Sequence, residues 1–402
     1  MKKTILFIFA MLIVFVGTAR TNDTSSILLP TGEIRFDKQP SILLKHEALL
    51  LSDTVTVDYL FENTADTPVE TTVFFPVPTV GPIIDGYVHD LHDFKFRVWS
   101  NGTEIIPSLS HQIIFHGTDV TKYFDLMGID SYLKPLTLQP FGEGNNGLEL
   151  EKVSAPLRKL PKAEQKRLKQ LGMIAKGCWQ KDEATNKCMH NPDVYHLVWG
   201  DYQQEAIYYW TQTFPPHQTI HIRHEYKPSF VENSIGAPRK FVQEIIGWDY
   251  EKPHEYWNEA SYIITTANNW QTPIKQFNLL IWGQTGAAVS AYKDEQTSYT
   301  RVAPKNYLLE TKQDFVPSQE ILFELAHTCD YAKREPSILP QLYRVDGPAR
   351  VRSIPNGRKI TTLENGRYVW AYPSDTKDWF VVLLDEKTTG YTYRTNLIPF
   401  GN

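Results

Sequence analysis

Histidines beside carboxylates come closest to a metal-binding pattern in this chain. His217, His221 and His224 lie close together in the sequence. On a strand, however, the first two are about 13 Å apart at ~3.3 Å per residue, and His224 faces the side opposite to His221. The run HDLHD at 89–93 is a better cluster, because its histidines could converge with a carboxylate in a loop. Such a short spacing is also common by chance in solvated loops, so we expect no metal and no cofactor.

Motifs for nucleophilic catalysis are missing from the sequence. There is no G-x-S-x-G elbow and no G-x-x-x-x-G-K phosphate loop. A cysteine peptidase places its histidine after the nucleophile, and no histidine follows Cys329, although His327 lies two residues before it. We therefore assign no catalytic residue. One alternative stays open, a secreted hydrolase of cell wall, glycan or peptide whose site is assembled from dispersed His, Asp and Glu.

Aromatic side chains mixed with amides favour recognition over catalysis. Flat rings that stack, together with groups that form hydrogen bonds, can hold a sugar or an extended peptide. The candidate ligand-binding residues are Trp210, His224, Tyr226, Asn268, Asn269 and Trp270, accompanied by Tyr208, Trp248 and Trp257. The competing interpretation is that most of these residues form a core, since aromatic residues are mostly buried. The expected ligand belongs to the cell wall, or is a glycan or peptide.

The amino terminus has the pattern of a secretory signal peptide over residues 1–19. Lys2 and Lys3 precede an apolar run at 4–16, and small residues allow cleavage near Ala19. The run is shorter than the ~20 residues that span a bilayer, so we expect no membrane span and a periplasmic or secreted extracellular protein. Cleavage would leave 39 basic against 46 acidic residues. That balance argues against a nucleic-acid partner, which requires a basic face.

The three cysteines suit an oxidising compartment and leave an odd one. Cys178 and Cys188 flank a short polar stretch, and a disulfide between them would contribute about 2–3 kcal/mol by the chain-entropy estimate. We predict that this pair is bonded and that Cys329 is free.

The elements that would position these residues are mostly strands. Alternation of apolar and polar residues at 54–78 predicts a β-hairpin at the centre of a sandwich, and Asn101-Gly102 predicts a tight hairpin. Shorter strands are predicted at 195–210, 219–226, 262–266, 277–282 and 321–326. Helices at 120–127 and 161–172 indicate a helical insertion at about 117–192. The fold class is therefore mainly β, with a β-sandwich-like main domain at 20–335.

A compact β-rich tail follows Pro336 and Pro340. About five short strands between turns, within 340–402, predict a small β-barrel with its own core. We expect residues 1–335 to fold without the tail. The tail either docks on its neighbour or, with its many arginines, binds cell wall or an acidic ligand.

Two family resemblances extend this interpretation. The tail, at 343–399, resembles a bacterial SH3-type domain through GPARVR at 347–352, Trp379 and Gly390-Tyr391. Residues 22–330 resemble the exported Gram-negative proteins of domain of unknown function 4424, through VDYLFEN at 57–63, HEYKP at 224–228 and YIITTANNW at 262–270. The resemblance implies an exported β-rich architecture and brings no established reaction. We therefore predict an exported, non-catalytic binding or scaffolding protein, and the sequence leaves its oligomeric state open.

Overall fold

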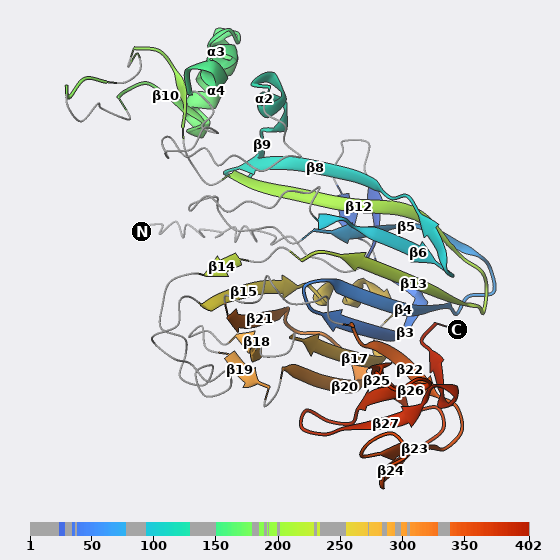
Figure 1. Ribbon diagram of the computed structural model, residues 1–402. Coiled ribbons are helices and arrows are strands. Elements are labelled where there is room, and N and C mark those ends of the chain that lie inside the picture. Colours follow the sequence, from blue (N-terminus) through green and yellow to red (C-terminus); the bar gives the residue numbers. More distant parts are fainter. Residues whose placement is uncertain are drawn as a thin grey trace, which may run out of the picture.

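A computed structural model describes most of the chain and is mainly β, as predicted. The residues described are 24–28, 34–36, 38–77, 94–128, 150–178, 185–188, 191, 193–198, 202–228, 231–233, 255–271, 273–283, 288–293, 299–303, 306–328 and 338–401. Three sheets form the main body, helices lie at one end of the molecule, and the tail lies at the other end (Figure 1).

The central sheet packs against the two other sheets of the main body and against the tail. Its order is β20-β17-β3-β4-β13-β6-β7, with β16 pairing beside β3. These strands are β3 (Gln39–Leu51), β4 (Val55–Asn63), β6 (Arg97–Ser100), β7 (Thr103–Ile105), β13 (Thr219–Tyr226), β16 (Trp270–Gln271), β17 (Ile274–Trp282) and β20 (Tyr307–Phe315). All neighbours are antiparallel except β3, which pairs in parallel with β17 and β16.

Two further sheets cover one face of the central sheet. The upper sheet contains β1 (Thr24–Leu28), β2 (Ile34–Phe36), β5 (Val69–Pro76), β8 (Ser108–Phe115), β9 (Thr118–Asp119) and β12 (Tyr202–Phe214). The side sheet contains β14 (Val231–Asn233), β15 (Glu255–Tyr262), β18 (Ala288–Lys293), β19 (Tyr299–Val302) and β21 (Ile321–Thr328). A single apolar core joins the three sheets, with Tyr59 from the central sheet, Phe75 from the upper sheet and Phe323 from the side sheet all fully buried.

The predicted hairpin at 54–78 is wrong in its pairing. β4 and β5 exist, but β4 pairs with β3 and β13 in the central sheet, whereas β5 pairs with β1 and β12 in the upper sheet. The chain crosses between the two layers at buried Asn63, whose Nδ2 donates to the carbonyls of Thr67 and Phe214, each at 2.8 Å. Turn residues are compatible with a hairpin in one sheet and with a crossing between two sheets, so the local pattern could not distinguish these two connections.

Of the other local predictions, one turn and one strand are confirmed and one strand is wrong. Asn101 and Gly102 both have positive φ and join β6 to β7 in the predicted tight hairpin. The strand predicted at 262–266 is wrong, because β15 ends at Tyr262 and a 3-10 helix, η1 (Thr265–Asn269), follows. β13 has the predicted bounds.

The helical part packs on the end of β8. It contains α2 (Thr121–Leu126), α3 (Leu150–Arg158), α4 (Lys162–Leu171) and the short pair β10 (Ile174–Ala175) and β11 (His196–Leu197). The structure confirms helices α2 and α4, and α3 was not predicted. Gly172 ends α4 in the left-handed conformation with φ 87°, as its position after the last turn implied.

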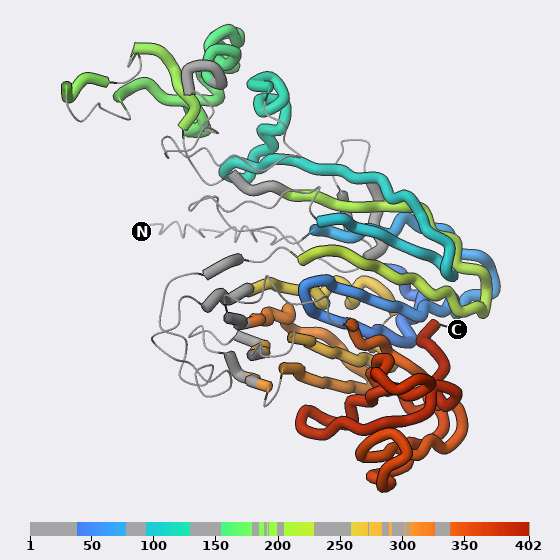
Figure 2. The backbone as a smooth tube through the Cα atoms, in the orientation of Figure 1, coloured from blue at the N-terminus to red at the C-terminus, as the bar shows by residue number. Residues whose placement is uncertain are grey.

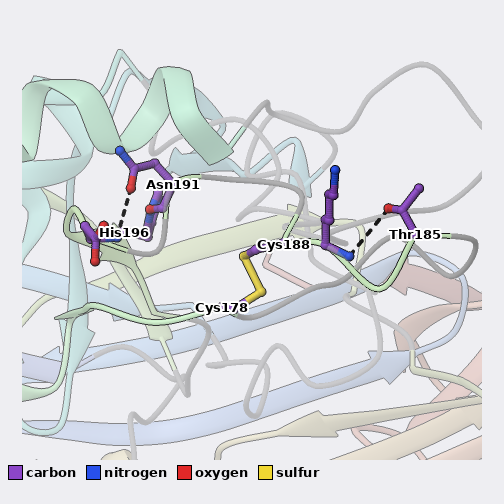
Figure 3. Close-up of a disulfide and its surroundings, with 7 residues drawn as sticks. Cys178, Thr185, Cys188, Asn191 and His196 are labelled. Carbon is purple, nitrogen blue, oxygen red and sulfur yellow. Dashed lines mark hydrogen bonds between the residues drawn. A yellow bond between two sulfur atoms is a disulfide. The ribbon is translucent and has the colours of Figure 1, made fainter.

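The structure contains the predicted disulfide between Cys178 and Cys188, with Cα atoms 5.6 Å apart (Figure 3). That separation lies within the usual range for a disulfide. Close by, Nε2 of buried His196 lies 2.6 Å from the carbonyl oxygen of Asn191. Cys329 lies outside the described residues.

The tail forms a sheet and a core of its own. Its order is β24-β23-β27-β26-β25-β22-β28, made of β22 (Gln341–Val345), β23 (Ala349–Arg352), β24 (Lys359–Leu363), β25 (Tyr368–Pro373), β26 (Trp379–Leu383), β27 (Thr389–Tyr393) and β28 (Leu397–Pro399). A 3-10 turn, η3 (Arg394–Asn396), precedes β28. Val345, Val351 and Val382 are fully buried between these strands. β24 and β28 were not predicted from the sequence.

The tail is docked on the face of the central sheet opposite to the main core (Figure 2). In β3 and β17 the side chains alternate, so Leu49 and Leu279 enter the main core while Leu50, Leu280 and Trp282 face the tail. The tail contributes apolar side chains to this docking interface, namely Leu342, Trp370 and Leu383, flanked by Leu339, Tyr368, Tyr372 and Phe400.

Polar contacts border the docking interface. The hydroxyl of Tyr307 donates to the carbonyl of Asp385 at 2.8 Å, and burial raises the pKa of that hydroxyl to about 12. Arg301, in β19 of the side sheet, forms ion pairs with Glu310 of the central sheet and with Glu386 of the tail.

Candidate functional site

A pocket of about 250 Å³ opens where the tail meets the outer face of β4 and β13. The main body contributes Leu60, Asn101, Thr219 and His221, and the tail contributes Arg344, Tyr368, Pro399, Phe400 and Gly401. We call this the junction pocket. It depends on docking, because neither the outer face of the central sheet nor the tail forms it alone.

His221 is bonded on two sides within the junction pocket. Its Nε2 lies 2.8 Å from Oδ1 of Asp58, which sits on the neighbouring strand β4. Arg223 donates to the other oxygen of Asp58 at 3.1 Å, so this carboxylate has two cationic or potentially cationic neighbours. The backbone N–H of His221 also donates to the side-chain oxygen of Asn101 at 2.9 Å. These bonds hold the imidazole in one orientation.

Gly401 closes the pocket against His221. It has φ +86°, and a Cβ at this position would lie 2.4 Å from Nδ1 of His221. Real Cβ atoms do not come that close to another heavy atom, so only glycine allows the end of the tail to lie this near the imidazole. Phe400 packs edge-on to the same ring, with centroids 5.9 Å apart.

Arg344 supplies positive charge to the junction pocket. Arg344 is half-buried, and its guanidinium forms no hydrogen bond or ion pair with any side chain that the structure describes. Thr219 and Tyr368, which both carry hydroxyls, line the same space. Five N–H donors of a guanidinium and two hydroxyls form a donor-rich wall, and such a wall is suited to a carboxylate or another small anion.

The predicted ligand-binding aromatics lie elsewhere, in the main core. Trp210, His224 and Tyr226 come together there, with Trp210 and His224 perpendicular at 5.4 Å between ring centroids. His224 is fully buried and Tyr226 is 2% exposed. Burial also raises the pKa of the Tyr226 hydroxyl. These side chains present no face on which a sugar could stack.

The second predicted group lies apart from the first. Trp270 is 3% exposed and packs against Phe61 and Phe214, at centroid distances of 4.9 and 6.1 Å. Asn268, in η1, donates to the carbonyl of Pro317 at 2.9 Å, and Asn269 is half-buried beside it. The burial of Trp270 and the structural bond of Asn268 argue against a shared binding surface. Their role as ligand contacts stays a prediction without support from geometry.

The remaining candidates fall into separate surroundings. His217 pairs with exposed Asp66 at 2.9 Å, His221 lines the junction pocket, and His224 lies in the core, which agrees with the strand argument. Trp257 is in β15. In the part of the chain that the structure describes, no three His, Cys, Asp or Glu side chains gather in a way that could hold a metal. Trp248 and the run at 89–93 lie outside that part.

The junction pocket was not predictable from local sequence patterns because its two halves are remote in sequence. The alternation of β13 correctly puts Thr219, His221 and Arg223 on one face. Nothing local indicates that Arg344 and Phe400 come to meet that face. The available signal was the continuous apolar run of β3 and β17, which is typical of strands buried on both sides.

The structure therefore defines a mainly β protein with a docked tail sheet and a pocket at the junction. A family model described as Domain of unknown function (DUF4424) matches residues 21–251 and 247–322. The chain belongs to this family, whose match ends before the tail. No curated protein matches the chain.

One solved structure is similar in part. It is a crystal structure of a protein from Legionella pneumophila that is described as a candidate nutrient binding protein. The two sequences are 12% identical, and the match covers 77% of this chain and 71% of the Legionella chain, with a TM-score of 0.35. Because that score is low, we base no argument on it. No helix among the described residues is long and apolar enough to cross a membrane.

Proposed function

We propose that this chain is an exported, non-catalytic binding protein of the periplasm or extracellular space, and that it binds a small anionic ligand in the junction pocket. The observation that supports this most is that Arg344 lines a pocket made by both parts of the chain and that no described side chain neutralises its charge. The same wall also suits the charged end of a larger cell-wall peptide or glycan.

Export and an SH3-type tail belong to the same proposal. The signal-peptide pattern at 1–19 and the disulfide in the helical part support an oxidising compartment outside the cytoplasm. The small antiparallel tail sheet with its own core is compatible with an SH3-type barrel. In this proposal the tail forms one wall of the binding site.

The geometry around His221 favours binding over hydrolysis. An Asp–His pair can activate a hydroxyl or thiol, which must then lie within hydrogen-bond reach of the other ring nitrogen. Nε2 of His221 is held by Asp58, and the Nδ1 side is covered by Gly401. Within the described residues no Ser, Thr or Cys side chain bonds to this imidazole. Arg223 also neutralises Asp58, so the pair is explained as a structural support for the pocket wall.

The first test compares two probes that differ in one charge. Isothermal titration calorimetry would measure binding of D-alanyl-D-alanine, which has a free carboxylate, and of its carboxamide. We expect the carboxylate to bind and the amide to bind at least about tenfold more weakly, since hydrogen bonds to charged groups contribute about 1.5–3 kcal/mol.

Variants then locate the site. Arg344→Gln should weaken carboxylate binding by about 10- to 100-fold, while the matched control Arg367→Gln, which changes the same charge at an exposed position of the tail, should not. Inorganic phosphate and N-acetylglucosamine serve as further probes. The proposal fails if no anionic probe binds, or if Arg344→Gln binds as tightly as the unmodified protein.

A further inference from the structure

One hairpin of the tail concentrates positive charge. Residues 349–363, formed by β23, β24 and their turn, contain four basic and no acidic residues, although the whole chain has a net charge of -5. We call this segment the basic hairpin. Arg352 donates to the carbonyl of Gly357 at 2.7 Å and thereby holds the turn. The other three, Arg350, Arg358 and Lys359, are exposed, and none of their side chains bonds to a described residue.

Two isoleucines of the same hairpin are partly exposed to solvent. Ile354, in the turn, is 60% exposed, and Ile360, in β24, is 40% exposed. Leaving an apolar side chain of this size in water forgoes most of its burial free energy. A single exposed isoleucine is ordinary, but two within seven residues, accompanied by three unpaired cations, give this hairpin both apolar and positive character.

The basic hairpin is free when the tail is docked. β24 is the edge strand of the tail sheet, whereas the docked side chains come from β22, β25 and β26. In Figure 1, β23 and β24 lie at the end of the molecule farthest from the helices and project away from the central sheet. A partner could therefore contact this hairpin without disturbing the junction pocket.

We propose that the basic hairpin docks on the surface of an anionic lipid bilayer. Cations next to a membrane are attracted by its negative surface potential, and apolar side chains on the same surface enter the boundary between headgroups and acyl chains. This combination accounts for both features of the hairpin. An acidic protein or a charged glycan would account for the arginines and the lysine, but it would leave the isoleucines in water.

Protection of an edge strand against aggregation is the alternative explanation, and it accounts for fewer of these residues. Edge strands often carry a lysine so that they do not pair with another chain, and Lys359 at the start of β24 fits this role. Arg350 belongs to β23, which is already paired on both sides, and Arg358 precedes the strand. Neither residue guards an open edge, and exposed isoleucines would promote aggregation.

The test uses the full chain and sedimentation with vesicles. Vesicles of phosphatidylglycerol and phosphatidylethanolamine provide the anionic surface, and phosphatidylcholine vesicles provide the neutral one. We expect binding to the anionic vesicles that weakens as salt rises, because screening shortens the reach of surface charges to about 8 Å at 0.15 M. The triple variant R350Q/R358Q/K359Q should bind about 100-fold more weakly, at about fivefold for each cation.

Matched variants separate this surface from general attraction. R367Q/K377Q/K387Q removes the same charge from exposed positions elsewhere on the tail and should retain binding within a few-fold. I354S/I360S should lose the binding that survives at higher salt. Equal loss in both triple variants, equal binding to neutral vesicles, or binding to peptidoglycan sacculi or acidic peptides but not to vesicles would each overturn the proposal. Thermal midpoints of all variants report whether the tail remains folded.

Discussion

His46 is the residue whose ionisation bears most directly on docking. It lies on the tail-facing side of β3, is 3% exposed, and packs edge-on against Tyr368 and Phe400 at centroid distances of 4.4 and 4.6 Å. Its Nε2 lies 2.7 Å from Oδ1 of Asn278. Burial lowers the pKa of His46 to about 4, against a smaller opposing effect of the Asn278 bond and of the Asp58 carboxylate.

This shift predicts that mild acid destabilises the folded protein. His46 is neutral in the folded state above about pH 4, whereas in the unfolded chain it takes up a proton below about pH 6.5. Its contribution is therefore intact above about pH 6.5 and declines as pH falls toward 4. We expect the free energy of unfolding to drop by about 2 kcal/mol more in the unmodified protein than in His46→Gln between pH 6.5 and 4.5.

Urea unfolding at several pH values measures this difference. Glutamine removes the titration and keeps an N–H that can reach Asn278. His217→Gln is the control, because the His217 side chain is 60% exposed and its partner Asp66 is 97% exposed. Parallel pH profiles for the unmodified protein and His46→Gln would show that His46 does not cause the loss of stability in mild acid.

At the scale of elements, β3 and β17 explain why the tail docks. Each alternates between the main core and the docking interface, so the sequence shows continuous apolar runs at 48–51 and 279–282 in place of the alternation expected for a half-buried strand. Such runs imply a covering layer on both faces. They do not identify the layer, because any apolar surface of suitable shape would satisfy them.

The interface tryptophan provides a test at this scale. Trp282 is 8% exposed and packs against Tyr372 of the tail, with ring centroids 5.6 Å apart. We expect Trp282→Ala to lower the free energy of unfolding by about 3–5 kcal/mol and to loosen the tail, because it leaves a large cavity in the interface.

Trp99→Ala is the comparison variant. Trp99 is partly exposed, and its ring lies under Arg97 at 4.6 Å, a contact that contributes about 0.5–1 kcal/mol. Urea unfolding combined with limited proteolysis would measure both stability and tail release. Similar small losses in the two variants would show that the docking interface contributes little.

Local patterns predicted the elements better than their partners. The alternation in β4, β5 and β13 was visible, and so were the Asn101-Gly102 turn and the end of α4 at Gly172. The assignment of β4 and β5 to different sheets depends on Asn63 bonding to the carbonyl of Phe214, 151 residues away. The candidate site has the same limitation, since the face that carries His221 was predictable and the tail residues opposite it were not.

For the whole molecule, docking changes the expectation that residues 1–335 fold alone. Removal of the tail would uncover Leu50, Leu280 and Trp282, which are at most 8% exposed in the folded chain. Each fully buried side chain of this kind contributes about 1.5–3 kcal/mol. We therefore expect a chain that ends at residue 337 to be less stable by several kcal/mol and to bind a dye for exposed apolar surface.

Hydrogen exchange would locate the change. Faster exchange should be confined mainly to β3, β17 and β20, while β5 and β12, remote from the tail, should be affected less. An unchanged midpoint of thermal unfolding in the shortened chain would mean that the tail is dispensable for the fold, as the sequence alone led us to expect.

The parallel pairing of β3 with β17 has a consequence for the order in which the chain folds. His46 and Asn278, which meet across this pair, are 232 residues apart. β3 is made early, yet one neighbour and the layer over one of its faces come from the last third of the chain. Contacts of such sequence separation form slowly, and an apolar strand that stays exposed before they form is prone to aggregate. Correct folding therefore requires that β3 avoids non-native pairing until β17 and the tail have been synthesised.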